Sequence, residues 1–153
     1  MLYYLVNAKT AAPLKLTKPP VPRVFKSKTF VRDARKAVIK DAQLCDAVDE
    51  LNMRQGDDLG GNVWKKRLNR NMHRAIAILA PRRFWLFVYL FAKKDRENIE
   101  DDELAAFKKL AKDVNKADDS SLTKFVKNGD FVEICNESDQ GQGAAKESKE
   151  RRI

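Results

Sequence analysis

The chain has 153 residues, of which 43% are hydrophobic and 35% charged, and its formal net charge at pH 7 is +9. This length is enough for one domain with its own hydrophobic core, and the composition predicts a folded, highly soluble protein. The longest unbroken apolar run covers nine residues, 84–92, whereas a membrane-spanning helix needs about 20. No membrane helix is therefore expected, and the N-terminal LYYLV lacks the basic residues that precede the apolar region of a signal peptide.

The two ends of the chain are predicted to lie outside the folded domain. In residues 1–22, Pro13 and the proline-rich run at 19–22 prevent helix formation, and we predict an N-terminal extension. Residues 136–153 have no apolar side chain larger than alanine before the final isoleucine, and we predict a disordered tail. The folded domain is therefore expected to span residues 23–135.

The first part of this domain is predicted to contain a short strand, at residues 23–26, and two helices. Apolar residues from Phe30 to Val38 recur at helical spacing and predict the first helix. The second helix is expected to start with Asp41 as its N-cap, to carry one apolar stripe and to end at Gly56. Together they predict an αα-hairpin.

Three strands are predicted after the turn at positions 60 and 61. Residues 62–68 alternate between two faces, residues 73–79 form the second strand, and residues 84–93 form the third. The third strand is apolar on both faces. It is therefore expected to be central in the sheet and covered on both sides.

The last part of the domain is predicted to contain two helices and a closing strand. Asn98 is the expected N-cap of a helix whose first turn carries the acids at 100–102 and whose apolar stripe runs from Leu104 to Val114. A short helix at 121–127 and a strand at 131–134 follow. The order of elements predicts an α+β domain with helices packed on a mainly antiparallel sheet.

The positive charge of the chain is concentrated between positions 59 and 94. This segment contains nine basic residues and no acidic one, whereas the rest of the chain contains 22 basic and 22 acidic residues. The nine residues are Lys65, Lys66, Arg67, Arg70, Arg74, Arg82, Arg83, Lys93 and Lys94. A dense group of cations held on a sheet is typical of a protein that binds a polyanion.

The cysteines and the histidine limit the metal and redox chemistry of the chain. Cys45 and Cys135 form no Cys-x-x-Cys motif, and we predict two free thiols, buried or idle, in a cytoplasmic protein. His73 is the only histidine, so these residues cannot build a usual metal site. No metal and no cofactor are therefore expected.

Several strings of the chain resemble the RelE/HigB-type toxins of bacterial type II toxin–antitoxin modules over about residues 23–135. They are KSKTFVRDARK, DLGGNVWKKRL, an arginine-bearing strand, FVYLFAKKDRENIEDDELAAFKKLA and GDFVEI. The resemblance implies a RelE-like α+β fold, with an N-terminal helical hairpin on a mainly antiparallel sheet of about four strands and a C-terminal helix. It also implies a cytoplasmic ribonuclease that cleaves mRNA, often on the ribosome, and a cognate antitoxin, expected to be a helix-turn-helix protein.

The resemblance also implies site residues. Lys65 and Arg67 match the basic pair of the first sheet strand of the motif, and Arg74 matches the arginine that begins the next strand. In the FAK-x-x-R-x-N segment the polar positions are Lys93, Arg96 and Asn98, and Tyr89 matches the strand aromatic. We predict Lys65, Arg67, Arg74 and Lys93 as catalytic, and Lys66, Arg70, His73, Arg82, Arg83, Tyr89, Lys94, Arg96 and Asn98 as RNA-binding.

The predicted chemistry is a metal-independent attack of the RNA's own 2′-hydroxyl on its phosphate. Arg67 and Arg74, on neighbouring strands, would offer forked donors to the charge that develops on the phosphate. Lys65 or Lys93 would act as the base if crowded positive charge lowers its pKa. One alternative for His73 is the role of an acid or base. Strand alternation places it on the opposite face of the sheet from Arg74 and favours the other alternative, a structural role.

Two further features leave alternatives open. Four strand aromatics could stack on RNA bases, but their density favours core packing; they are Trp64, Trp85, Phe87 and Phe91. The loop at 69–73 is shorter than in the related toxins and has no glycine pair. Three hypotheses therefore remain: an RNA-cleaving toxin, a ParE-like inhibitor of DNA gyrase, and a toxin homologue that only binds antitoxin or nucleic acid.

Overall fold

The structure is a computed structural model that describes residues 22–136. Apart from Pro22 and Asn136, the predicted extension and tail lie outside these residues. The elements in chain order are β1 (Arg23–Ser27), α1 (Lys28–Lys36), α2 (Asp41–Asn52), β2 (Asp57–Gly60), β3 (Val63–Leu68), β4 (His73–Ala80), β5 (Phe84–Ala92), α3 (Asp101–Lys116), α4 (Asp119–Lys127) and β6 (Phe131–Ile134).

The strands form a six-stranded sheet in the order β2-β3-β4-β5-β1-β6. Its neighbouring strands are antiparallel except β1 and β5, which are parallel. β5 lies inside the sheet and is buried along its length, with only Tyr89 and Ala92 partly exposed. The predicted α+β class and the central position of this strand are therefore confirmed, although the sheet has more strands than expected.

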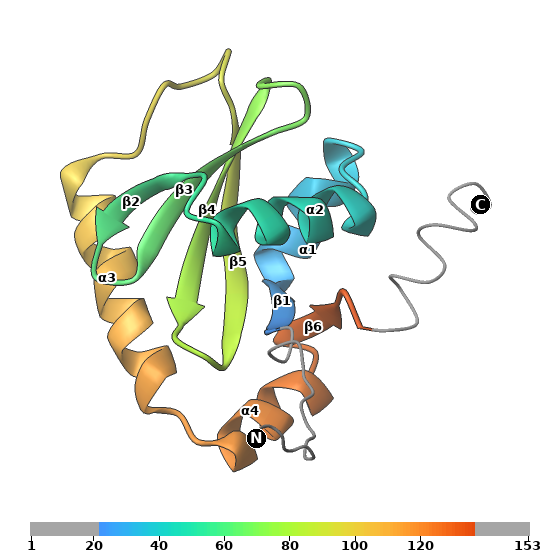
Figure 1. The fold of residues 1–153 in the computed structure, drawn as a ribbon, viewed down its shortest axis with the longest axis vertical. Helices are drawn as coiled ribbons and strands as arrows, with labels where there is room; N and C mark the ends of the chain where they lie inside the picture. Colours follow the sequence, from blue (N-terminus) through green and yellow to red (C-terminus); the bar gives the residue numbers. More distant parts are fainter. Residues whose placement is uncertain (1–21, 137–153) are drawn as a thin grey trace, which may run out of the picture.

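The helices cover both faces of the sheet, with α1 and α2 on one side and α3 on the other (Figure 1). Phe30 of α1 and Leu44 of α2 pack into one buried cluster with strand residues such as Phe87. Val114 of α3 and Leu122 of α4 belong to a second cluster on the opposite face. The predicted αα-hairpin on the sheet is confirmed, and the two cores explain why β5 is apolar on both of its faces.

One strand, β2, is absent from the prediction. Its sequence is Asp-Asp-Leu-Gly, and aspartate and glycine are poor strand formers. It becomes a strand because Asp57 and Asp58 pair with Lys65 and Trp64 of β3 across a tight turn. That pairing depends on the neighbouring strand and leaves no periodic pattern in the segment itself.

The helix ends also differ from the prediction. α3 is capped by Glu100, which forms a capping box with Glu103, and not by Asn98. α2 has Asp41 as its first residue rather than its cap, and it ends at Asn52, well before Gly56. Residues that can cap a helix are frequent in loops, so composition alone does not select the one that does.

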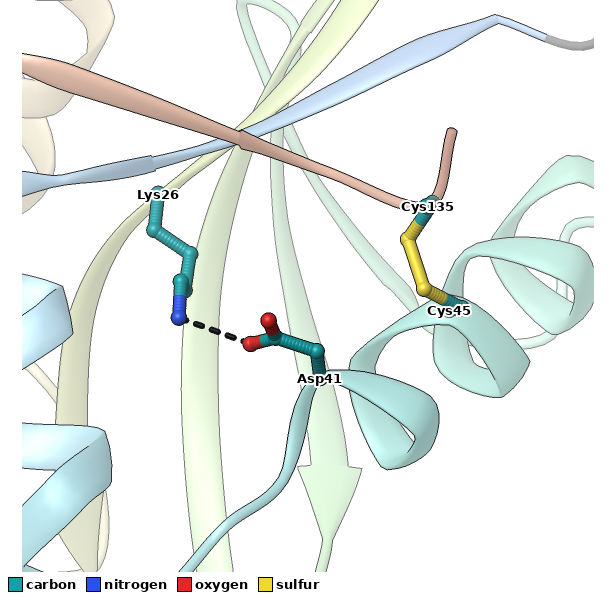
Figure 2. Close-up of a disulfide and its surroundings, with 4 residues drawn as sticks. All are labelled: Lys26, Asp41, Cys45 and Cys135. Carbon is teal, nitrogen blue, oxygen red and sulfur yellow. Dashed lines mark hydrogen bonds and ion pairs between the residues drawn. A yellow bond between two sulfur atoms is a disulfide. The ribbon is translucent and has the colours of Figure 1, made fainter. Parts of the chain in front are cut away.

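The cysteines form a disulfide, so the prediction of two free thiols is wrong. Cys45 of α2 is bonded to Cys135, which directly follows β6, across a sequence separation of 90 (Figure 2). The two lie together because β6 pairs with β1 and brings the end of the domain beside α2. Lys26 of β1 also holds α2, since its Nζ lies 2.7 Å from Oδ1 of Asp41 (Figure 2).

Helices that could cross a membrane would have to be both long and apolar, and residues 22–136 contain none.

Candidate nucleic-acid site

Three of the predicted catalytic residues lie on the face of the sheet that α3 covers. Side chains two residues apart on a strand share a face, so Lys65 and Arg67 lie on the same face as Val63 along β3. Arg74 lies on the same face as Ile76 along β4. Val63 and Ile76 belong to the core on the α3 side. Arg67 and Arg74 are directly opposite each other in the register of the two strands. Like charges that face each other across strands destabilise a sheet, so this pair is not explained by folding.

Arg74 is buried, with 9% of its surface exposed. Its Nη1 donates to the main-chain oxygens of Asn71 at 2.9 Å and His73 at 3.1 Å. A guanidinium has five N–H donors, and Nε and Nη2 of Arg74 have no hydrogen-bond partner within residues 22–136. Arg74 thus braces the β3–β4 loop and keeps donors available for an anion.

Lys65 is held in place beside the segment that follows β5. Its Nζ donates to Oδ1 of Asn98 at 3.2 Å and lies 3.8 Å from Oδ2 of Asp57. The side chain is only 15% exposed, so its aliphatic part packs on the sheet while the ammonium remains at the surface. Asn98 therefore acts by orienting Lys65 and by accepting from the N–H of Ile99.

Arg96 connects the segment after β5 to the start of α3. It forms two hydrogen bonds with the carboxylate of Glu103, and its Nη1 also donates to the hydroxyl of Tyr89 at 3.0 Å. Its guanidinium lies over the rings of Phe91 and Tyr89, 5.6 Å and 5.9 Å from their centroids. These contacts use most of the donors of Arg96 and hold the segment after β5 against the start of α3.

Acidification is expected to release this contact. The hydrogen bond from Arg96, followed by the bond from the N–H of Glu100, lowers the pKa of Glu103 from its ordinary value of 4.5. The stability that Glu103 contributes is therefore complete above pH 4.5 and is lost as the pH falls through its lower folded pKa. Amide hydrogen exchange over residues 96–103, divided by the intrinsic exchange rate at each pH, should therefore show a loss of protection in that acidic range.

The matched control for this prediction is Glu103→Gln, which removes the titrating group. Exchange over residues 96–103 should be faster than in the wild-type protein at pH 7, and its acid-dependent step should be lost. An identical pH dependence in the two proteins would mean that Glu103 does not hold the segment.

Four predicted RNA-binding residues lie away from the opposed pair Arg67 and Arg74. Lys66 points to the other face, where Nζ contacts Glu50 Oε1 at 2.7 Å and ties β3 to α2. His73 also alternates to that side, with Nδ1 3.1 Å from Nδ2 of Asn69. Arg82 and Arg83 occupy the β4–β5 turn, at the far end of strands that are about 25 Å long.

The segment 59–94 contains no acid of its own, but three of its cations are paired with acids from other parts of the chain. Lys65 lies beside Asp57, Lys66 beside Glu50, and Arg83 beside Asp119 at 3.4 Å. These acids come from other parts of the chain, where a count along the sequence does not find them. By contrast, the side chains of Arg67, Arg70, Lys93 and Lys94 form no hydrogen bond or ion pair with any residue that the structure describes.

Three of the unpaired cations, Arg70, Lys93 and Lys94, border a pocket where the β3–β4 hairpin ends beside the end of β5. The pocket has a volume of about 610 Å³ and is lined by Arg70, Asn71, Met72, His73, Ala92, Lys93 and Lys94. In the loop above it, Asn69, Arg70 and Asn71 have φ values of 53°, 56° and 70°. The loop is held by the contacts of Arg74 and by the N–H of Lys93, which donates to the main-chain oxygen of Met72 at 2.9 Å.

The strand aromatics are part of the core. Trp64, Trp85, Phe87 and Phe91 are between 0% and 6% exposed, so the prediction of core packing is confirmed. Tyr89 differs because it is partly exposed and offers its hydroxyl to Arg96. Within residues 22–136 there is no group of three or more histidine, cysteine, aspartate or glutamate side chains arranged to hold a metal ion.

Residues 22–134 match the family model described as the RelE toxin of the RelE/RelB toxin–antitoxin system. No curated protein and no solved structure gave a match. The family match covers nearly the whole described domain and agrees with its α+β architecture and basic sheet. The chain therefore belongs to the RelE toxin family and is a toxin of a toxin–antitoxin module.

Proposed function

We propose that this toxin is an endoribonuclease that cleaves mRNA and is neutralised by a cognate antitoxin. The observation that carries the proposal is the group of cations around the opposed pair Arg67 and Arg74. Arg67, Arg70, Lys93 and Lys94 have no partner within residues 22–136, and Arg74 bonds only to main-chain oxygens. Unpaired cations on adjacent elements repel one another, and this repulsion is relieved when they bind phosphates.

In the proposed reaction the 2′-oxygen of the RNA attacks the adjacent phosphorus. The bond between phosphorus and the 5′-oxygen breaks, and the fragments end in a 2′,3′-cyclic phosphate and a 5′-hydroxyl. Arg67 and the free donors of Arg74 would bind the phosphate oxygens and stabilise the negative charge of the transition state. This step requires no metal, because guanidinium groups supply the positive charge.

Proton transfer in this reaction is assigned to the lysines. Lys93 is the better candidate for the base, because its side chain has no partner in the described part of the chain. After losing its own proton to water, its neutral amine would take the 2′-hydroxyl proton. Lys65 is held by Asn98 and Asp57 and is better suited to binding the phosphate. The leaving 5′-oxygen would receive a proton from a neighbouring ammonium or from water.

Incubating the purified protein with mRNA, with and without ribosomes, tests the proposal. We expect fragments with 2′,3′-cyclic phosphate ends in at least one condition. The control variant Lys127→Ala removes one positive charge from outside the cation group, because Lys127 is an exposed residue of α4. This variant should cleave RNA as the wild-type protein does. Intact RNA in both conditions, with folding verified by circular dichroism, would reject ribonuclease activity.

Two further measurements, of gyrase supercoiling and of RNA binding, identify the alternative functions. Inhibition of DNA supercoiling by gyrase without RNA cleavage would identify a ParE-like toxin. RNA binding without cleavage would identify a homologue that has lost the reaction, and the short β3–β4 loop would then be the first feature to examine.

The proposed partners follow from the same charges. An antitoxin, which we expect to be a helix-turn-helix protein, would neutralise the toxin by covering the cation group with an acidic segment. The substrate mRNA, free or on the ribosome, places the activity in the cytoplasm. In that reducing compartment the bond between Cys45 and Cys135 would be exposed to thiol reductants.

A further inference from the structure

We propose that the pocket at the end of the β3–β4 hairpin binds one nucleotide of the RNA, with Met72 contacting the base. Arg70, Lys93 and Lys94 would bind the phosphates on either side of that base. The inference rests on the proposed function and adds to it a base-binding subsite, separate from the opposed arginine pair. It is drawn from the composition, exposure and rigidity of the pocket.

Met72 is an apolar side chain in an otherwise polar and positively charged loop. It is 54% exposed, although a side chain of this size is usually buried. The other pocket residues include three unpaired cations and the small apolar Ala92. A ligand that matches this pocket needs a flat apolar surface and negative charge beside it, and a nucleotide has both.

The main chain on both sides of Met72 is fixed. The oxygens of Asn71 and His73 accept from Arg74, and the oxygen of Met72 accepts from the N–H of Lys93. The Met72 side chain therefore projects from a backbone that is already ordered, so binding does not require the loop to be ordered first. A thioether is also polarisable and makes favourable contacts with aromatic rings.

Arg74 connects the pocket loop to the proposed reaction site. Arg74 bonds directly to the loop that lines the pocket, and it faces Arg67 on the neighbouring strand. One side chain thus joins the pocket and the arginine pair. A single-stranded RNA could place one base against Met72 and the adjoining phosphate at the arginines.

The test measures the affinity of single-stranded RNA for the variant Met72→Ser by fluorescence anisotropy. The same measurement uses an RNA in which the bases have been removed. Met72→Ser should weaken the binding of ordinary RNA by about 5-fold. It should leave the binding of the abasic RNA unchanged, and it should not alter the dependence of affinity on salt, because no phosphate contact is lost.

Met53→Ser is the matched control. Met53 is 63% exposed at the end of α2, and the preceding Asn52 accepts from Trp85, near the start of β5 and away from the pocket. This variant should bind both RNAs as the wild-type protein does. Arg70→Ala should show the opposite behaviour to Met72→Ser. For both RNAs, log affinity should fall less steeply with log salt, and the slope should be smaller in magnitude by about 0.7.

The outcomes separate the subsite from the proposed function. The base subsite is refuted if Met72→Ser binds ordinary RNA as the wild-type protein does, or if its affinity for both RNAs falls equally. The ribonuclease proposal stands in either case. If the wild-type protein binds neither RNA, the base subsite is refuted, and the ribonuclease proposal is then decided by cleavage of mRNA in the presence of ribosomes. Met72 is exposed, so its replacement should leave the thermal unfolding midpoint unchanged, and this is measured for each variant.

Discussion

Replacing Arg74 with alanine is expected to lower the rate of RNA cleavage by about 100-fold to 1000-fold, the usual effect of removing one donor that stabilises transition-state charge. Arg74 combines two properties that no other cation of the group has. Its Nη1 is bonded to the oxygens of Asn71 and His73, while Nε and Nη2 have no partner within residues 22–136. The measurement is single-turnover cleavage at saturating protein, which reports the chemical step without the binding step.

The variants Arg74→Lys and Arg67→Ala distinguish phosphate contact from loop bracing. Lysine keeps the charge, but it cannot hold two main-chain oxygens and a phosphate in one plane, so Arg74→Lys should recover little activity. Arg67 is exposed and has no bond to the loop, so Arg67→Ala should slow cleavage and leave base-dependent binding unchanged. Full activity in Arg74→Ala would remove this residue from the site.

The fold was predictable where a segment carries its own pattern. β5 is apolar on both faces and α3 carries an apolar stripe, and both elements are confirmed at nearly the predicted bounds, although Leu110 of the predicted stripe is exposed. β2 was missed because its four residues become a strand only through pairing with β3. The N-cap of α3 was misplaced by two residues, since Asn98 and Glu100 are both plausible caps in sequence and only the structure shows which one acts.

The candidate site was predictable to the level of strand geometry. Alternation along β3 predicts that Lys65 and Arg67 share a face, and the structure confirms it. The facing of Arg67 and Arg74 could also have been inferred, because a hairpin centred on residues 70 and 71 pairs residue 67 with residue 74.

The partners of the cations could not be inferred in the same way. The contact of Lys66 with Glu50 and that of Arg96 with Glu103 depend on how helices pack beside the strands. Neither contact leaves a periodic signal in the sequence. For the same reason the sequence did not separate the cations that stay unpaired within residues 22–136 from those that hold the fold together. That division is what makes Arg67, Arg70 and Lys93 the residues to test.

Reduction of the disulfide is expected to have the largest effect on stability. The bond between Cys45 and Cys135 closes a loop with a sequence separation of 90. In the chain-entropy description, a cross-link over a loop of this size stabilises the folded state by roughly 4–5 kcal/mol relative to the unfolded chain. For a domain of this size that free energy corresponds to a fall of about 15 °C in the unfolding midpoint.

Thermal unfolding with and without a thiol reductant measures this effect, and the double variant Cys45→Ser with Cys135→Ser is its control. The double variant should unfold near the midpoint of the reduced protein and should not respond to reductant. An equal midpoint for the oxidised and reduced wild-type proteins would show that the bond does not stabilise the domain. Free thiols in the protein purified without reductant, titrated after denaturation, would show that the bond does not form.

The disulfide joins α2 to the chain after β6 (Figure 2). The unpaired cations lie at the end of β3, in the β3–β4 loop and directly after β5. Reduction should therefore lower stability without rearranging the candidate site. Below the unfolding midpoint of the reduced protein, RNA affinity and cleavage should be the same in both redox states. At temperatures between the two midpoints only the oxidised protein should remain active, because only its folded state is populated. The amount of active toxin would then depend on the redox state of its surroundings through folding alone.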